Sequence, residues 1–496
     1  MTRTFSSNAN RTNKPQSYLL SLLLRGDYGA HQENLYYPID PLIACDPGPS
    51  NNQTQKINRT FVGNSKYGGV FDGVIFKMSP QVRSFPKTPI FGFYSPNLQK
   101  DDLSWNQYLW PFASVFKADG WNYSRSGEYS TYHLLFTRDH LPRNFIEGRQ
   151  MIGTMGVANC IGGTKAQQLH CRREYAKKYN CKFEDLRIQP FQYDMHDFND
   201  CNLFFQQFTT DKVFLAKPTN SKHGDGIDIY FPEDLPRIEQ RFGTCSQAFL
   251  LVENIKNPVL IDGHKIDLRT YLLVASMRPK LAFIYKHGIF RKSSRKFDLF
   301  ARDQEVHILN SRNQSLHNHF YNYTYMNRIF ENEYNFGPNF IQRILHPQIR
   351  KIQRFVFESQ IFKMPVKKYP VNHRGRFHIF AMDWIVDTTG HVFLLEGNRF
   401  PAIVNYPEGV GVTPNIWYEF LQLIKLIQIY PRTMNESQPM LVRRRYAYRG
   451  WELIYNEIEE MYAKIIEKKA YDPCREFLNE EERVVIQNQH EGFSHS

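Results

Sequence analysis

The stretch DWIVDTTGHVFLLEGN, residues 383–398, places ionisable groups within segments that are otherwise strongly apolar. Two apolar runs flank Asp387-Thr388-Thr389-Gly390, whose residue types favour a tight turn. The stretch is therefore predicted to form an antiparallel hairpin. With the turn centred on Thr388 and Thr389, Asp383 would lie opposite Leu394.

The predicted hairpin gathers oxygen-bearing side chains on one face. Because residues two apart on a strand share a face, Asp383, Glu396 and Asn398 would converge on one side. Two carboxylates and an amide oxygen suit a hard cation, and they favour a magnesium ion held together with phosphates. The alternative is a hairpin whose polar face is exposed to water, and the hairpin alone leaves both interpretations open.

Composition limits the class of protein. With 496 residues and 42% hydrophobic content, the chain can bury a large core and divide into two or three subdomains. The seven cysteines are scattered, odd in number and without a Cys-x-x-Cys pair, so reduced cytosolic thiols are expected rather than a disulfide framework or a zinc site. The longest apolar run near the N-terminus, 19–24, is too short to span a bilayer, so neither secretion nor membrane insertion is expected.

Four regions are predicted along the chain. They are an irregular segment (1–65), an N-terminal and linker subdomain (66–205), a region of strands and polar loops (206–435) and a basic helical tail (436–496). Apolar spacing predicts helices over 164–179 and 340–362, strands over 212–217 and 259–276, and a helix from Trp451 onward.

A polar loop follows the strand that ends at Lys217. The segment 218–227 contains Gly224-Asp225-Gly226 and leads to another strand, so its backbone could approach phosphates while Lys217 supplies a positive charge. It is not a P-loop, because no Gly-Lys-Ser/Thr follows. The alternative is an ordinary hairpin loop.

Charges alternate with apolar residues in the next strand. Lys265, Asp267 and Arg269 are separated by Ile266 and Leu268, so three charges line one face. They could form the wall of a nucleotide site, with Arg269 forking onto a carboxylate or phosphate. The alternative is a solvated ladder of ion pairs on an edge strand.

Taken in order, these motifs resemble the tubulin–tyrosine ligase-like family of ATP-grasp ligases. The resemblance rests on Phe214-Leu215-Ala216-Lys217 with its glycine loop, 262–269, Tyr285-Lys286-His287-Gly288, His307-Ile308-Leu309-Asn310, Asp383 and 394–398. Upstream, Asp119-Gly120-Trp121 and 133–137 also resemble that family's N-terminal region. The fold class implied is α+β: an ATP-grasp fold with antiparallel sheets flanked by helices, preceded by a smaller N-terminal α/β subdomain.

The resemblance implies a role for each matching residue. The implied contacts to ATP come from Lys217, His223, Gly224, Asp225, Gly226, Val252, Glu253, Asn254, Ile255, Lys265, Asp267 and Arg291. The residues implied to lie near the γ-phosphate and the incoming amino acid are Arg269, Lys286, Arg291 and Asn310. The residues implied to hold Mg²⁺ are Asp383, Glu396 and Asn398. The usual Gln-Lys-Tyr adenine hinge is replaced by Val252-Glu253-Asn254, and Lys286 stands where some members carry arginine.

The implied function is ATP-dependent glutamylation, glycylation or tyrosination of an acidic polypeptide, with tubulin tails as the leading acceptor. A formal charge of +13 agrees with an anionic partner, steered to basic segments such as 363–376 and 443–445. A cytoplasmic location follows, on the cytoskeleton, cilium or flagellum, with no nucleic-acid or membrane partner. A second hypothesis is a catalytically weak member that binds microtubules or another acidic partner. A nucleic-acid binder ranks third, because no RNA-binding motif accompanies the charge.

Overall fold

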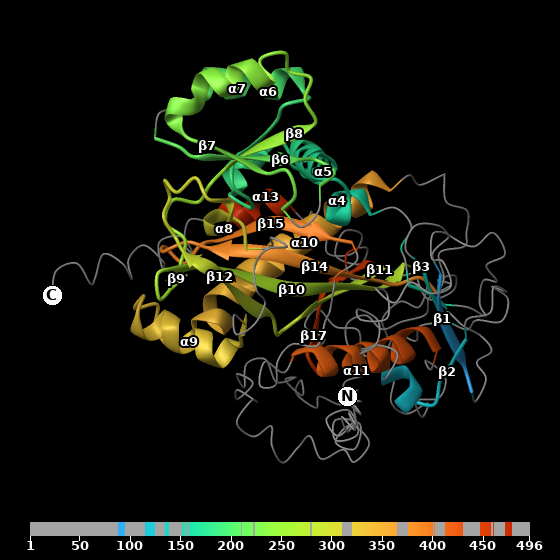
Figure 1. The fold of residues 1–496 in the computed structure, drawn as a ribbon. Helices are drawn as coiled ribbons and strands as arrows, with labels where there is room; N and C mark the ends of the chain where they lie inside the picture. Colours follow the sequence, from blue (N-terminus) through green and yellow to red (C-terminus); the bar gives the residue numbers. More distant parts are fainter. Residues whose placement is uncertain are drawn as a thin grey trace, which may run out of the picture.

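The computed structural model describes residues 88–94, 115–124, 134–137, 151–153, 155, 158–209, 211–221, 224–277, 280–309, 320–364, 375–399, 401, 412–429, 447–457, 460 and 472–478. These residues form a mixed α+β structure in which three sheets are flanked by helices (Figure 1). The expectation of antiparallel sheets with flanking helices is confirmed for two of the three sheets. None of the described helices is long and apolar enough to cross a membrane.

The central sheet is built on one long strand, β10 (His264–Met277). Its first half pairs with β12 (Ile289–Lys296), its second half with β11 (Lys280–Tyr285), and its other edge with β14 (His378–Val386). The remaining strands of this sheet are β9 (Leu260–Ile261), β13 (Phe320–Tyr321), β15 (Val392–Asn398), β16 (Ala447–Tyr448) and β17 (Trp451–Asn456). All of these pairings are antiparallel.

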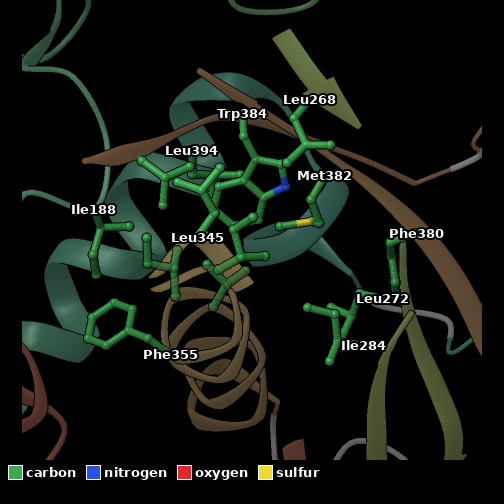
Figure 2. Packing of buried hydrophobic residues seen from close by; sticks show 14 of the residues in the cluster. Ile188, Leu268, Leu272, Ile284, Leu345, Phe355, Phe380, Met382, Trp384 and Leu394 are labelled. Carbon is green, nitrogen blue, oxygen red and sulfur yellow. The ribbon is translucent and has the colours of Figure 1, made fainter. Parts of the chain in front are cut away.

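One face of the central sheet is apolar along its length. In β14, Phe380, Met382 and Trp384 point to this face, where α10 (His346–Lys363) packs through residues such as Phe355. Figure 2 shows the Trp384 indole among Leu268, Met382 and Leu394. The indole N–H donates to the Thr270 hydroxyl over 2.8 Å, so its polar atom is satisfied inside the core.

The opposite face of the same sheet changes character halfway along. Tyr271 and Leu273 of β10 pair with Ala381 and Ile379 of β14, and all four are buried in a second core with α11 (Val412–Ile424). The next pair on this face is Arg269 with Asp383. The face is thus divided between an apolar half and a charged half, and the charged half forms the floor of the candidate site.

Two smaller sheets accompany the central one. The first has the order β5-β8-β6-β7, with strands Gln192–Asp194, Phe249–Glu253, Phe214–Pro218 and Asp228–Tyr230, and lies beside α6 and α7 (Figure 1). The second is parallel, with the order β2-β1-β3-β4 and strands Asn122–Tyr123, Ile90–Tyr94, Leu134–Thr137 and Met151–Ile152.

The helices complete the layers. Besides α10 and α11 they are α4 (Asn159–Gly162), α5 (Lys165–Lys178), η3 (Phe183–Leu186), α6 (Phe198–Gln207), η4 (Pro232–Asp234), α7 (Leu235–Phe242), α8 (Gln304–His307), α9 (Tyr323–Asn332), η5 (Ile341–Leu345), η6 (Lys425–Ile429) and α13 (Pro473–Leu478). The predicted helix over 164–179 is confirmed as α5, which begins at a capping box of Thr164 and Gln167. The predicted helix over 340–362 is confirmed as η5 followed by α10.

The prediction of a helix from Trp451 is wrong for residues 451–456, whereas Glu457 and Glu460 are helical. Trp451 and Ile454 lie on β17, which pairs with β11 and extends the central sheet. Their spacing of three residues suits a helix, but both side chains are buried in the sheet's cores, Trp451 on one face and Ile454 on the other. A strand that is buried on both faces does not alternate between apolar and polar residues. Its sequence therefore could not be distinguished from that of a helix.

The prediction of reduced thiols is also wrong for six of the seven cysteines. The structure pairs them in disulfides Cys160–Cys171, Cys181–Cys474 and Cys201–Cys245. Their sequence separations are 11, 293 and 44 residues, so spacing along the chain gave no signal. The second bridge ties α13 to the loop before η3.

Removing the Cys181–Cys474 bridge should lower the free energy of unfolding. Because it closes the longest loop of the three, Cys474→Ser is expected to cost roughly 2–5 kcal/mol, measured by urea unfolding of the oxidised protein. The same two proteins compared after reduction are the control, and their urea midpoints should then agree. Equal urea midpoints for Cys474→Ser and wild type would show that the bridge contributes nothing.

Candidate functional site

The hairpin over residues 383–398 is formed by β14 and β15, but its register differs from the prediction. Trp384 lies opposite Leu394, while Asp383 lies opposite Glu396. Leu395 has no partner, and this β-bulge shifts the pairing by one residue. The predicted pairing of Asp383 with Leu394 is therefore wrong.

The bulge is what brings the three candidate metal ligands together. Leu394 is buried on the apolar face of the sheet, beside Trp384. Without a bulge, Glu396 would point to that same apolar face, because residues two apart share a face. The extra residue turns Glu396 to the charged face instead, where Asp383 and Asn398 also lie. The predicted convergence is confirmed, although by a different geometry.

Asp383 is the centre of a buried ion-pair network. Its two oxygens accept from Nε and a terminal nitrogen of Arg269, each over 2.7 Å, and a terminal nitrogen of Arg291 lies 3.3 Å away. Arg291 in turn forks onto Asp267. All four side chains are at least about nine-tenths buried. The predicted alternative of a solvated ladder is therefore wrong for Asp267 and Arg269.

The network fixes the charge of Asp383. Although burial opposes ionisation, the neighbouring guanidinium groups of Arg269 and Arg291 hold the pKa of Asp383 down at about 2. Burial has the larger influence on Asp267 and raises its pKa, against the opposing effect of Arg291. Asp383 is thus a carboxylate at neutral pH.

Asn398 connects the two carboxylates of the hairpin. Its amide nitrogen donates to Oδ2 of Asp383 over 3.2 Å and to Oε1 of Glu396 over 3.3 Å. Glu396 is half-buried. Rotation of the Asn398 amide by half a turn would present its oxygen beside both carboxylates, which gives the oxygen-only ligand set that Mg²⁺ prefers. The described residues contain no group of three or more His, Cys, Asp or Glu side chains placed to hold a metal ion, so the amide is needed to complete this set.

Lysines from two sheets interact with the acidic groups of the site. Lys217 is the last residue but one of β6 in the smaller sheet, and its charge interacts with Glu396 on β15. Lys265 on β10 interacts with both Lys217 and Asp267. Burial lowers the pKa of Lys217 to about 8, and burial together with the charge of Lys217 lowers the pKa of Lys265 to about 7. Two lysines from different sheets form a site suited to phosphate.

The predicted phosphate loop connects two paired strands, as the sequence indicated. β6 and β7 pair as a hairpin, and the loop between them contains Gly224 and Gly226, which have φ values of 76° and 72°. Such positive values favour glycine, and they turn the backbone sharply after Lys217. His223 lies outside the described residues. Asp225 is exposed at the tip of the loop.

The predicted adenine hinge, Val252 to Ile255, lies at the end of β8 beside these lysines. The Glu253 N–H donates to Phe191 O and the Asn254 N–H donates to Val213 O, each over 2.8 Å. The Glu253 side chain pairs with Lys212. Asn254 is buried, and its side chain contacts both Lys265 and His307. In this conformation, two of the hinge N–H groups already have partners and are not available to a base.

Of the four predicted catalytic residues, two are found in the ion-pair network around Asp383. Lys286 lies at the end of β11, where its charge interacts with Glu419, His287 and His346. Asn310 lies outside the described residues. Arg269 and Arg291 are in the cluster, but their guanidinium groups bind Asp383 and Asp267.

Two residues of α5 at this site were not predicted. Lys165 Nζ donates to Ser221 O over 2.9 Å, and its charge interacts with Glu396. Gln168 binds the backbone of Gly397, between Glu396 and Asn398. The glycine-rich segment just before α5 is visible in the sequence, but only the tertiary packing of α5 against β15 reveals this role.

Comparison with known proteins places this arrangement in a family. The family model described as "Tubulin-tyrosine ligase family" matches residues 162–437, more than half of the chain. The chain belongs to the tubulin-tyrosine ligase family. The matched segment contains the central hairpin, β10, the phosphate loop and α5.

Relatives within the tubulin-tyrosine ligase family are distant. The chain is 23% identical over 384 residues to the protein polyglycylase TTLL10 of Mus musculus, covering 68% of this chain and 52% of that protein. It is 24% identical over 294 residues to the inactive polyglycylase TTLL10 of Homo sapiens (53% and 42%), and 26% identical over 263 residues to the human tubulin polyglutamylase TTLL7 (48% and 28%). The chain spans about half the length, or less, of these curated relatives.

Proposed function

We propose that this chain is an ATP-dependent ligase of the ATP-grasp type that joins an amino acid to a carboxylate of an acidic polypeptide. The observation that carries the proposal is the meeting of two sheets at one site: the charge of Lys217 on β6 interacts with Glu396 on β15 and with Lys265 on β10, and Glu396 lies opposite Asp383. Lysines beside two carboxylates match a nucleotide that brings phosphates and a divalent cation together.

The residues divide into two groups by what they would contact. Lys165, Lys217 and Lys265 would neutralise phosphate charge, and the backbone of Gly224 to Gly226 would approach the phosphates. Asp383, Glu396 and Asn398 fit Mg²⁺ by donor type, and the ion would draw charge from the β- and γ-phosphates. Arg269 and Arg291 would keep Asp383 ionised.

The proposed reaction has two steps. An oxygen of the acceptor carboxylate attacks the γ-phosphorus of ATP, which forms an acyl phosphate and releases ADP. The amine of the incoming amino acid then attacks the carbonyl carbon, phosphate leaves, and the nitrogen loses a proton as the amide bond forms. Both steps concentrate negative charge on phosphate oxygens, so fixed cations in a desolvated site would supply most of the catalysis.

The test is incorporation of a labelled amino acid. The protein would be incubated with Mg-ATP, an acceptor and each of glutamate, glycine and tyrosine in turn, with tubulin and a polyglutamate peptide as the acceptors. ATP-dependent transfer of one amino acid supports the proposal. No transfer to either acceptor, together with no binding of Mg-ATP, would overturn it.

Nucleotide binding should weaken as pH rises above 7. The folded pKa of Lys265 is about 7, against about 10.5 in an unfolded chain, and a bound phosphate would raise it again. Binding therefore takes up a proton above pH 7, and the affinity should level off about one pH unit below 7 and be more than about tenfold lower at pH 8.5 than at pH 7. Titration of a fluorescent ATP analogue at several pH values measures this, and Lys265→Met should remove most of the dependence. An affinity that does not change between pH 7 and 8.5 would contradict phosphate contact by Lys265.

A second function is a family member that binds an acidic partner with little catalysis. It is favoured by the hinge, where the Glu253 and Asn254 N–H groups already have partners, and one human relative is named an inactive polyglycylase. Binding of tubulin without measurable binding of Mg-ATP would support this second function.

We propose that tubulin is the acceptor. One human relative is named a tubulin polyglutamylase, and microtubules or cilia would be the location that matches a tubulin acceptor. The basic segments proposed to steer an acidic tail lie largely outside the described residues. Lys363 pairs with Glu174 and Arg376 is buried, so neither presents a free charge to a partner as predicted. The cytosolic location was argued from reduced thiols. Because six cysteines form three disulfides, that argument no longer holds.

A further inference from the structure

Gln168 contacts the strand that carries two of the candidate metal ligands. Its Oε1 accepts from the Gly397 N–H and its Nε2 donates to the Gly397 carbonyl, each over 3.0 Å. Gly397 stands between Glu396 and Asn398. Among the described strands, β15 pairs with β14 alone, so these two bonds take the place of a neighbouring strand at its other edge.

The Gln168 amide is itself held rigidly. Its oxygen also accepts from a terminal nitrogen of Arg172 over 2.9 Å, and its nitrogen also donates to Gly163 O over 3.0 Å. Both amide hydrogens and both lone-pair directions are therefore used. Gln168 is 4% exposed, and Arg172 is 2% exposed and fixed by Gln189 over 2.8 Å.

The backbone around Gln168 leaves little room for movement. A Cβ atom on Gly397 would lie 1.9 Å from Ile161 O, and one on Gly162 would lie 2.7 Å from the Arg399 Cβ. Helix α4 thus packs backbone to backbone against the end of β15. The Cys160–Cys171 disulfide joins α4 to α5, which carries Gln168. Strand end, short helix and α5 form one unit.

We propose that Gln168 is a positioning residue that fixes Glu396 and Asn398 at the spacing a divalent cation requires, with Arg172 orienting its amide. The inference rests on the proposed function, because it assigns Gln168 to the Mg²⁺ part of that site. Gln168 touches neither nucleotide nor metal in this role. It acts through Gly397, as groups behind metal ligands commonly do.

The test compares Gln168→Met with a matched control. Methionine keeps the length and burial of the side chain but removes both bonds to Gly397. The Mg²⁺ concentration at half-saturation of a fluorescent ATP analogue should rise by about 10- to 100-fold. Gln428→Met is the control. Gln428 lies in η6, is also buried, and donates to the backbone oxygen of Ala275 over 2.6 Å. It should lower the melting temperature similarly without changing the Mg²⁺ midpoint.

Two further measurements keep the inference separate from the proposed function. Hydrogen–deuterium exchange of the peptide containing Gly397 should be faster in Gln168→Met and unchanged in Gln428→Met, whether or not nucleotide binds. In Gln168→Glu the carboxylate still accepts from Gly397 and Arg172, so this variant should recover part of the loss. An unchanged Mg²⁺ midpoint or unchanged exchange in Gln168→Met overturns the positioning role. Absence of Mg-nucleotide binding in the wild type overturns the proposed function, and with it the metal role of Gln168.

Discussion

Asp383→Ala should lower the free energy of unfolding by about 3–5 kcal/mol, because it leaves two guanidinium groups without their shared carboxylate inside the protein. Arg269 would lose both of its bonds to Asp383, and Arg291 would keep its fork onto Asp267. Urea unfolding monitored by tryptophan fluorescence measures the change, since Trp384 is the next residue along β14.

The matched control for Asp383 is a carboxylate in a half-exposed ion pair. Asp228 pairs with Arg241 near the surface, and its side chain is 43% exposed. Asp228→Ala should therefore change the free energy of unfolding by no more than about 1 kcal/mol. If Asp383→Ala changed the free energy of unfolding as little as this control, the buried ion-pair network would not contribute to stability.

Glu396→Gln should abolish function with little cost in stability. Glu396 is half-buried, and its carboxylate accepts from the Asn398 amide and faces Lys165 and Lys217. Glutamine keeps its size but removes the charge that a divalent cation would bind, so Mg²⁺-dependent nucleotide binding should weaken at least about 100-fold. ATP consumption and amino-acid transfer should fall together, measured by ADP release and by labelled product.

Glu184→Gln serves as the control for Glu396, because Glu184 pairs with Arg173 in the same part of the fold but lies outside the site. That variant should keep wild-type nucleotide binding. Retained turnover in Glu396→Gln would show that this carboxylate does not handle the metal, whatever its position.

These two variants separate roles that the sequence alone presented as equal. Asp383 and Glu396 both appeared as acidic residues in apolar strands, and the pattern suggested one metal site for both. In the structure, Asp383 also anchors two arginines, so it serves the fold as much as the site. A sequence pattern shows which residues share a face, but it does not show which long side chains will reach them.

The parts of the fold that local patterns predicted are those with a clear period. The helix over 164–179, the strand that leads to Lys217 and the alternation of charges in β10 were each visible in the chain and are each confirmed. The sequence correctly predicted that the charged residues of β10 share one face, but an exposed ladder of ion pairs on that face was wrong. Periodicity identifies the residues that share a face, and it does not show whether other parts of the chain cover that face.

The parts that local patterns missed depend on distant contacts. Cys181 and Cys474 meet across 293 residues, Gln168 meets Gly397 across 229, and Trp451 joins a sheet through β11. No window of a few residues contains both partners of such a contact. The missing neighbours were therefore also the reason that the tail was predicted as a helix.

The unpaired Leu395 makes two neighbouring parts of one hairpin independent of each other. On one side of it, Val392 and Leu394 follow the register of the apolar core, while on the other side Glu396 and Asn398 follow the register of the charged face. A substitution at Leu394 would therefore act on the apolar core and one at Glu396 on the charged face, although an unbroken strand would place both residues on one face.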